Sequence, residues 1–283
     1  MPEARHPSPS DSAPSARAAR LLRRHAPDYA ARTDDARVLG DSGRERNVLV
    51  VFSVDGETYV LKRFGTRPGD AVRTLLRPIS RHVARAFVLW GVARERAANE
   101  YATIRRFREA GHATFDLVAQ TSPVALLYRH HPGRHLRAAL RDAPETLRPA
   151  LVHRFASDVG RRQAQALADG DRSLVHGHPR VQHAYLTADD ELLHFDFEAI
   201  PNDALPLETL LAYEADRLLG SLARFAQTAT RECLDAAADG LGAAAMARWR
   251  GLPRRASVFA GNRPLLGRMA ADRLLTGESL VVA

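Results

Sequence analysis

Apolar and polar positions alternate over short stretches in the first half of the chain, a pattern typical of half-buried strands. The β-branched run 47–53 and the stretch 58–64 flank Asp55-Gly56, a dipeptide that favours a two-residue hairpin turn. We therefore predict an antiparallel hairpin here. The other elements expected in this half are helices over 70–90, broken near Pro78, and 94–109, and strands over 115–120 and 124–128.

After the helix breaker His131-Pro132-Gly133 the apolar spacing becomes mostly helical. The expected elements are long helices over 144–167 and 207–226, two strands at 184–187 and 191–195, and two or three helices in the last fifty residues. A β-rich part followed by a helical part predicts an α+β fold of two lobes. We set the boundaries at a disordered basic tail over 1–25, a first lobe over 26–131 and a helical lobe over 132–283.

Composition narrows the class of protein. The chain has 283 residues, and no apolar stretch approaches the roughly 20 residues of a membrane span. The single cysteine, Cys233, excludes an internal disulfide framework, and the N-terminus has no apolar signal region, so we expect a cytoplasmic protein. A formal charge of +8 favours phosphates or an anionic membrane face. No nucleic-acid-binding module or interleaved aromatic pattern is present, so we expect no nucleic-acid partner.

Lys62 is the only lysine among 41 basic residues. It lies in the expected strand 58–64, where alternation places it on one face with Val60 and Phe64. Glu100 lies in the middle of the apolar face of the helix 94–109. Carboxylates are seldom buried without a partner, so we predict that Lys62 and Glu100 pair. The alternatives are that Lys62 is a surface lysine and that Glu100 lies at the edge of the apolar helix face, in contact with water.

Four histidines and an acidic pair gather in the segments His176-Gly177-His178-Pro179-Arg180-Val181-Gln182-His183 and His194-Phe195-Asp196-Phe197-Glu198. Imidazoles at this density are typical of a zinc, iron or copper site. A catalytic loop followed by a metal-holding Asp is a second interpretation. Histidines that cap a loop or face solvent are the third.

The order of these parts resembles the protein-kinase-like superfamily: strand lysine, helix glutamate, sheet, long helix, His-Gly-His loop, hairpin and Asp-Phe-Glu. The loop is similar to that of aminoglycoside phosphotransferases and RIO-type kinases, and most similar to that of lipopolysaccharide-core (Kdo/heptose) kinases. In those kinases a histidine stands where most kinases have asparagine, and His183 matches it. The resemblance covers about residues 48–226.

The resemblance implies a two-lobed kinase-like fold, a small β-rich N-lobe and a helical C-lobe, that transfers the γ-phosphate of ATP to a hydroxyl. Lys62 would bind the nucleotide phosphates and Glu100 would orient it. Asp196 would hold Mg²⁺, or Mn²⁺, with His183 as a second ligand. Residues 126–131, with Tyr128 and Arg129, would form the hinge beside the adenine. The acceptor is unknown, with a lipopolysaccharide-core sugar as one candidate.

Two departures from the family keep alternatives open. His178 stands in the position of the catalytic Asp, and no glycine-rich phosphate loop precedes Asn47. If His178 is the base, it works only while neutral, and activity should rise with pH across the neutral range. The alternatives to an active kinase are a pseudokinase that binds nucleotide or a partner without catalysis, and a histidine-rich metalloenzyme.

Arginines recur at every fourth position at 73, 77, 81 and 85, among apolar residues. A helix of this composition can lie on anionic lipid, so we expect peripheral contact with the inner face of a membrane as one partner. A solvated helix face is the alternative.

Overall fold

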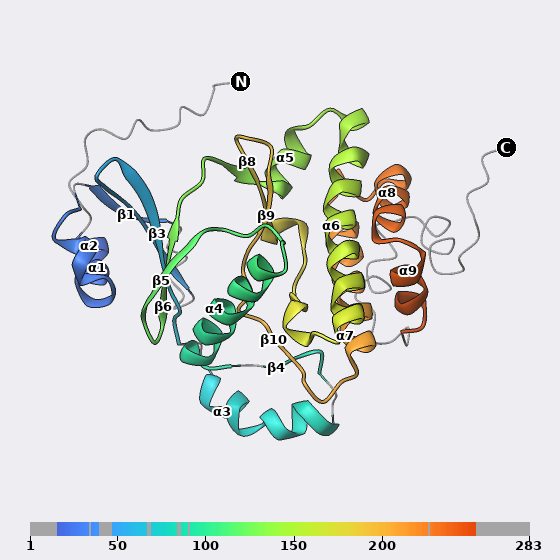
Figure 1. Ribbon diagram of the computed structural model, residues 1–283, viewed down its shortest axis with the longest axis horizontal. Helices are drawn as coiled ribbons and strands as arrows, with labels where there is room; N and C mark the ends of the chain where they lie inside the picture. The colour runs from blue at the N-terminus through green and yellow to red at the C-terminus, as the bar shows by residue number, and fades with distance from the viewer. Residues whose placement is uncertain are drawn as a thin grey trace.

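The computed structural model describes residues 16–33, 35–39, 47–66, 69–83, 86–89, 91–225 and 227–252. In these residues a β-sheet region is followed by a helical part, which confirms the predicted α+β class. Figure 1 shows the sheet on the left, helices α6 to α9 on the right and α4 between them. No helix in the described part of the chain is both long and apolar enough to cross a membrane.

Five antiparallel strands in the order β1-β2-β3-β6-β5 form the main sheet. Their bounds are β1 Asp35–Leu39, β2 Val48–Val54, β3 Glu57–Arg63, β5 Leu117–Ser122 and β6 Ala125–Arg129. The predicted hairpin turn is present, with positive φ at both Asp55 (53°) and Gly56 (79°). Two left-handed residues are what a type I′ turn requires, and they set the register of β2 on β3.

The N-terminal segment corrects one prediction. Residues 16–25, assigned to a disordered tail, form helix α1 (Ala16–His25), which α2 (Pro27–Ala30) follows, and residues 1–15 lie outside the described part. Ala18 and Leu22 are fully buried in a core with strand residues such as Phe52. They are one helical turn apart and form an apolar stripe that the arginine-rich composition concealed.

The segment expected as one interrupted helix over 70–90 is shorter and more varied. Helix α3 (Asp70–Leu75) precedes a π-helical turn at Ile79–Val83, and β4 (Val88–Leu89) then pairs with β10 (Ile200–Pro201). Helix α4 (Ala93–Glu109) agrees with prediction. In Figure 1 α3 lies at the bottom, away from the sheet.

The remaining elements form the helical part. They are β7 (Gly133–His135), α5 (Leu136–Asp142), α6 (Arg148–Asp169), β8 (Ala184–Thr187), β9 (Leu192–His194), α7 (Leu207–Ala223), α8 (Arg231–Leu241) and α9 (Ala243–Arg250), with single 3₁₀ turns at Glu145–Leu147, Arg172–Leu174 and Val181–His183. The predicted hairpin among the helices is β8–β9, to which β7 adds a third strand. One core cluster unites both parts, since Phe64 and Leu126 of the sheet region pack in it with Phe107, Leu174 and Phe197.

Two glycines bring helices α6 and α8 together. A Cβ at Gly160 would lie 2.7 Å from the carbonyl oxygen of Leu241, and one at Gly240 would lie 2.6 Å from that of His153. Both neighbours are backbone atoms, which cannot move aside as a flexible side chain can. The helices can therefore approach this closely only without side chains at these positions.

We predict that Gly160→Ala destabilises the protein by about 1–3 kcal/mol, the usual cost of overpacking. Helix propensity alone would give the opposite sign, a gain of about 1 kcal/mol. Urea unfolding measures the difference. The control Ala164→Gly, at an exposed position of the same helix, measures the free-energy difference between Ala and Gly in α6 without a clash. A Gly160→Ala variant more stable than the parent would contradict this packing.

Candidate functional site

A cavity of about 590 Å³ lies between the sheet and the helical part. Leu49, Val60 and Lys62 line it from the sheet, Glu100 from α4, and Tyr185 and Asp196 from the β8–β9 region. Its volume is within the range of small-molecule sites, about 300–1,000 Å³. Residues far apart in sequence thus meet around one cavity that opens to solvent.

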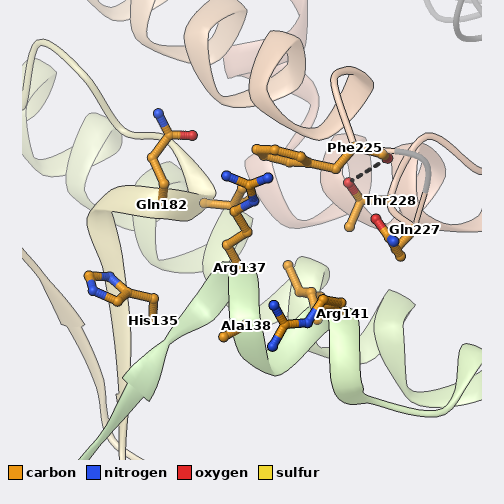
Figure 2. A pocket seen from close by; sticks show the side chains of 10 residues that line it. His135, Arg137, Ala138, Arg141, Gln182, Phe225, Gln227 and Thr228 are labelled. Atoms are coloured by element: carbon orange, nitrogen blue, oxygen red, sulfur yellow. Dashed lines mark hydrogen bonds between the residues drawn. The ribbon is translucent and has the colours of Figure 1, made fainter. Parts of the chain in front are cut away.

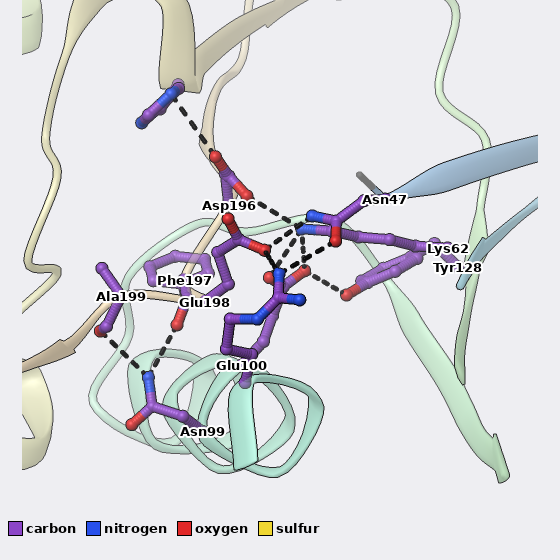
Figure 3. A network of polar contacts seen from close by, with 11 residues as sticks. Asn47, Lys62, Asn99, Glu100, Tyr128, Asp196, Phe197, Glu198 and Ala199 are labelled. Atoms are coloured by element: carbon purple, nitrogen blue, oxygen red, sulfur yellow. Dashed lines mark hydrogen bonds and ion pairs between the residues drawn. The ribbon is translucent and has the colours of Figure 1, made fainter. Parts of the chain in front are cut away.

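Lys62 occupies the interior of this cavity. It is only 8% exposed, and β3 pairs it with Leu126 of β6 and Leu49 of β2. Its Nζ donates to both carboxylate oxygens of Glu100, at 2.9 and 2.7 Å, and to Oδ1 of Asp196 at 2.9 Å (Figure 3). The predicted Lys62–Glu100 pair is confirmed.

Two carboxylates act on this ammonium group. Burial by itself would lower the pKa of Lys62, but the charges of Asp196 and Glu100 outweigh burial and raise it above its usual range. Burial raises the pKa of Glu100, and the nearby Lys62 opposes that rise. Lys62 therefore stays protonated at neutral pH.

Tyr128 holds Glu100 from the other side. Its hydroxyl donates to Oε1 of Glu100 at 2.6 Å, which fixes the carboxylate between strand β6 and the lysine. Tyr128 also lines the cavity, and its hydroxyl supports the ion pair; its place beside an adenine stays a prediction. Arg129 points to the opposite face of the strand, where its guanidinium pairs with Glu57 at 3.1 Å. The predicted contact of the Arg129 side chain with a cofactor is not supported, because neighbouring strand positions face opposite sides.

Asp196 follows strand β9 and has a left-handed backbone, with φ at 67°. Such a conformation is costly for a residue other than glycine and often accompanies function. Oδ1 accepts from Lys62, and Oδ2 lies 3.4 Å from Nε2 of His183. Burial would raise the pKa of Asp196, but Lys62 and then His183 lower it below its usual range. The carboxylate is thus ionised at neutral pH.

A second network, which sequence reasoning missed, ties the same elements together (Figure 3). Arg96, one helical turn before Glu100, is buried and donates to Oε2 of Glu198 at 2.8 Å and to Oδ1 of Asn47 at 3.1 Å. Asn47 also donates to Glu198, at 2.6 Å. Asn99 donates to the carbonyl oxygens of Phe197 and Ala199. No local pattern signals this network, because Arg96 and Glu198 are 102 positions apart in the chain.

A buried carboxylate, that of Glu214, binds the backbone of the loop 176–183. Glu214 of α7 accepts from the backbone N–H of His176 at 2.5 Å and from Arg162 of α6 at 3.1 Å. Both side chains of this Arg162–Glu214 pair are at most 1% exposed. The 3₁₀ turn at the end of the loop presents His183, whose Nδ1 lies 2.9 Å from the carbonyl oxygen of His178. Position and orientation of the loop are therefore fixed.

His178 is neutral in this environment. Burial, with Arg180 and Arg217 adding to it, lowers the pKa of His178 to about 3. The expected rise of activity as His178 loses its proton across the neutral range finds no support here, because burial holds the pKa of this imidazole well below that range. A neutral imidazole can still accept a hydrogen bond from a hydroxyl.

The histidines do not converge on one centre. No group of three or more His, Cys, Asp or Glu side chains suited to a metal ion occurs among the residues that the structure describes. His194 instead makes a 2.5 Å contact with Asp158, and His176 packs against Phe197. The described residues therefore give no support to the alternative interpretation of a histidine-rich metal centre. The pair Asp196 and His183 offers one carboxylate and one imidazole, a donor set that fits an ion shared with a phosphate-bearing ligand.

Comparison with models of known protein families and with curated proteins gave no match, so the cavity and its ion pairs are the basis for assigning function.

Proposed function

We propose that this chain is an ATP-dependent phosphotransferase with a two-lobed protein-kinase-like fold, the sheet region forming the N-lobe and the helical part the C-lobe. The observation that carries the proposal is the buried Lys62, bound by Glu100 of α4 and by Asp196 after β9. A protonated lysine at the inner end of a cavity attracts phosphate oxygens. An acidic residue beside it suits a divalent cation bridging the same phosphates.

The aromatic residues that line the cavity suit a purine. Tyr185, Phe115 and Phe195 pack edge-on or tilted there, with Tyr185 and Phe115 centroids 5.1 Å apart and Phe115 and Phe195 centroids 5.8 Å apart. Leu49 and Val60 line the cavity from the sheet. Apolar side chains of the sheet and these three aromatic rings would supply the contacts for a flat base.

In the proposed reaction the acceptor oxygen forms a bond to the γ-phosphorus, and the bond from that phosphorus to the β–γ bridging oxygen breaks. ADP leaves with the bonding electron pair. Asp196 and His183 would hold a divalent ion, which would supply charge neutralisation on the phosphates. His178 accepts the hydrogen bond of the attacking hydroxyl and positions it, and the proton passes to the transferred phosphoryl group or to solvent. Positioning and charge account for most of the catalysis in this chemistry.

A pseudokinase is the second candidate function, and the environment of His178 favours it. An imidazole with a pKa of about 3 is a weak base, and a carboxylate is the usual residue at this place of the family's loop. A measurement of turnover distinguishes an active kinase from a pseudokinase. ATP binding with no phosphoryl transfer to any acceptor or to water would assign the chain to the pseudokinases.

We predict that Lys62→Arg and Lys62→Met each weaken ATP binding by at least about tenfold, a difference of about 1.4 kcal/mol. A planar guanidinium cannot replace a compact ammonium between two carboxylates. Calorimetric titration with ATP and Mg²⁺ measures the loss. Arg105→Met, which removes an exposed cation from α4, is the control. Parental affinity in both Lys62 variants would refute the nucleotide site.

Replacing Mg²⁺ by Mn²⁺ should raise the affinity for ATP, because Mn²⁺ accepts an imidazole ligand more readily than Mg²⁺ does. In His183→Ala the two ions should give equal affinities. The same titration, run with each ion, tests this. A preference for Mn²⁺ that persists in His183→Ala would exclude His183 as a ligand.

Contact with an anionic membrane remains a proposal, and the α3 region supports it. Val72, Leu75, Leu76 and Ile79 are 45–78% exposed and lie within eight residues. Arg77 and Arg81 in the same segment pair with Glu95 and Asp203. The side chains at 73 and 85 lie outside the described residues.

We predict that Leu75→Asp lowers binding to phosphatidylglycerol-containing vesicles by about tenfold, since burial of one leucine contributes about 1.5–3 kcal/mol. Sedimentation with vesicles measures the bound fraction. Leu147→Asp changes an equally apolar side chain, 56% exposed, in another part of the chain and should bind as the parent does. Equal losses in both variants would contradict a role for α3.

A further inference from the structure

We propose that Arg180, Arg217 and Arg224 form a second anion site, beside His178, that binds a phosphate group carried by the acceptor. The anion site stands on the arrangement of these arginines. Its assignment to the acceptor rests on the proposed phosphotransferase function.

The three arginines are brought together by one hydrogen bond. The backbone N–H of Val181, next to Arg180, donates to Oγ of Ser221 on α7 at 3.2 Å. Arg217 and Arg224 lie four residues before and three residues after Ser221, so all three positions share one face of the helix. Arg180 therefore lies against the α7 face that carries Arg217 and Arg224.

Among the residues that the structure describes, no carboxylate forms an ion pair with these guanidinium groups, although the charge of Asp216 acts on the neighbouring Arg217. In the part of the chain that the structure describes, no hydrogen bond or ion pair is formed by the side chain of Arg180, Arg217 or Arg224. Asp216, adjacent to Arg217, accepts from the indole of Trp249 at 3.1 Å. By contrast, Arg96 and Arg162 in the same region are bound to buried carboxylates.

One donor of the group is both buried and unsatisfied. Nε of Arg217 has no accessible surface and no hydrogen-bond partner. A buried donor without a partner costs about 1–3 kcal/mol, and neighbouring like charges add repulsion. An oxyanion placed among the three arginines would offset the repulsion between their charges.

A phosphate suits this arrangement better than a single carboxylate. Guanidinium groups bind phosphate oxygens through two parallel N–H bonds, and a dianion offsets more of the three positive charges. Arg180 follows His178 by two residues, so an anion bound here lies close to the hydroxyl that His178 positions. The site would thus select acceptors with a phosphate near the reacting hydroxyl.

An adjoining cavity offers room for the rest of such a molecule (Figure 2). It has a volume of about 540 Å³, and Val181 and Phe225, the chain neighbours of Arg180 and Arg224, line it. Arg137 lies 4.0 Å above the Phe225 ring, and Figure 2 shows Gln182 and Thr228 around the same space. This cavity shares only His135 and Ala138 with the proposed nucleotide cavity.

Titration of inorganic phosphate at low ionic strength tests the anion site by calorimetry. The parent should bind phosphate saturably, and Arg217→Gln and Arg224→Gln should each lose at least about tenfold in affinity. Arg224 is exposed, so its variant should fold even if the Arg217 variant does not. The control Arg105→Gln should keep the parental affinity. Non-saturable binding, or equal losses in Arg224→Gln and Arg105→Gln, would overturn the proposal.

Lys62→Met separates this proposal from the nucleotide site. Phosphate binding that survives Lys62→Met but not Arg224→Gln supports the arginine site, even if ATP binding fails in the parent. If Lys62→Met abolishes phosphate binding and Arg224→Gln leaves it intact, the phosphate binds in the nucleotide cavity. That result would refute the arginine site.

Competition against inorganic phosphate identifies the source of the group. Glucose 6-phosphate, with glucose as its uncharged control, represents a soluble acceptor. Phosphatidylcholine vesicles with and without phosphatidic acid represent a lipid one. Competition by either phosphorylated probe supports an acceptor-borne phosphate, and competition by neither refutes it.

Discussion

One buried ammonium group, that of Lys62, determines how the parts of this protein meet. Strand β3 carries it, and its partners Glu100 and Asp196 come from α4 and from the end of β9. A buried ion pair that loses one partner costs about 3–5 kcal/mol, because the remaining charge stays uncompensated. The three elements must therefore fold into a single arrangement, and the cavity around Lys62 is a result of that requirement.

The surrounding contacts restrict the same three elements further. Tyr128 fixes the free side of Glu100, and Arg96 joins α4 to Glu198 two residues after Asp196. The hydrophobic cluster that includes Phe64 and Phe197 packs the sheet region against the helical part. Charged and apolar contacts thus favour the same geometry, which is the consistency expected of a well-specified site.

Much of this could be predicted from the sequence, because local periodicity decides it. Alternation in β3 and the helical spacing of α4 identified Lys62 and Glu100, and the turn Asp55-Gly56 set the first hairpin. Other features depend on distant contacts. The burial of Ala18 and Leu22, which orders α1, and the partnership of Arg96 with Glu198 have no local signature. The neutrality of His178 is likewise a property of its surroundings.

Because Lys62 is the only lysine, the chain has one side-chain amine, and that amine lies inside the cavity. Apart from the N-terminal amine, an amine-selective reagent therefore has one side chain to modify. The folded protein shields it, because the ammonium group is buried, protonated and bound by two carboxylates. Labelling at this single position would therefore report separation of the sheet region from the helical part, free of the background that surface lysines give in other proteins.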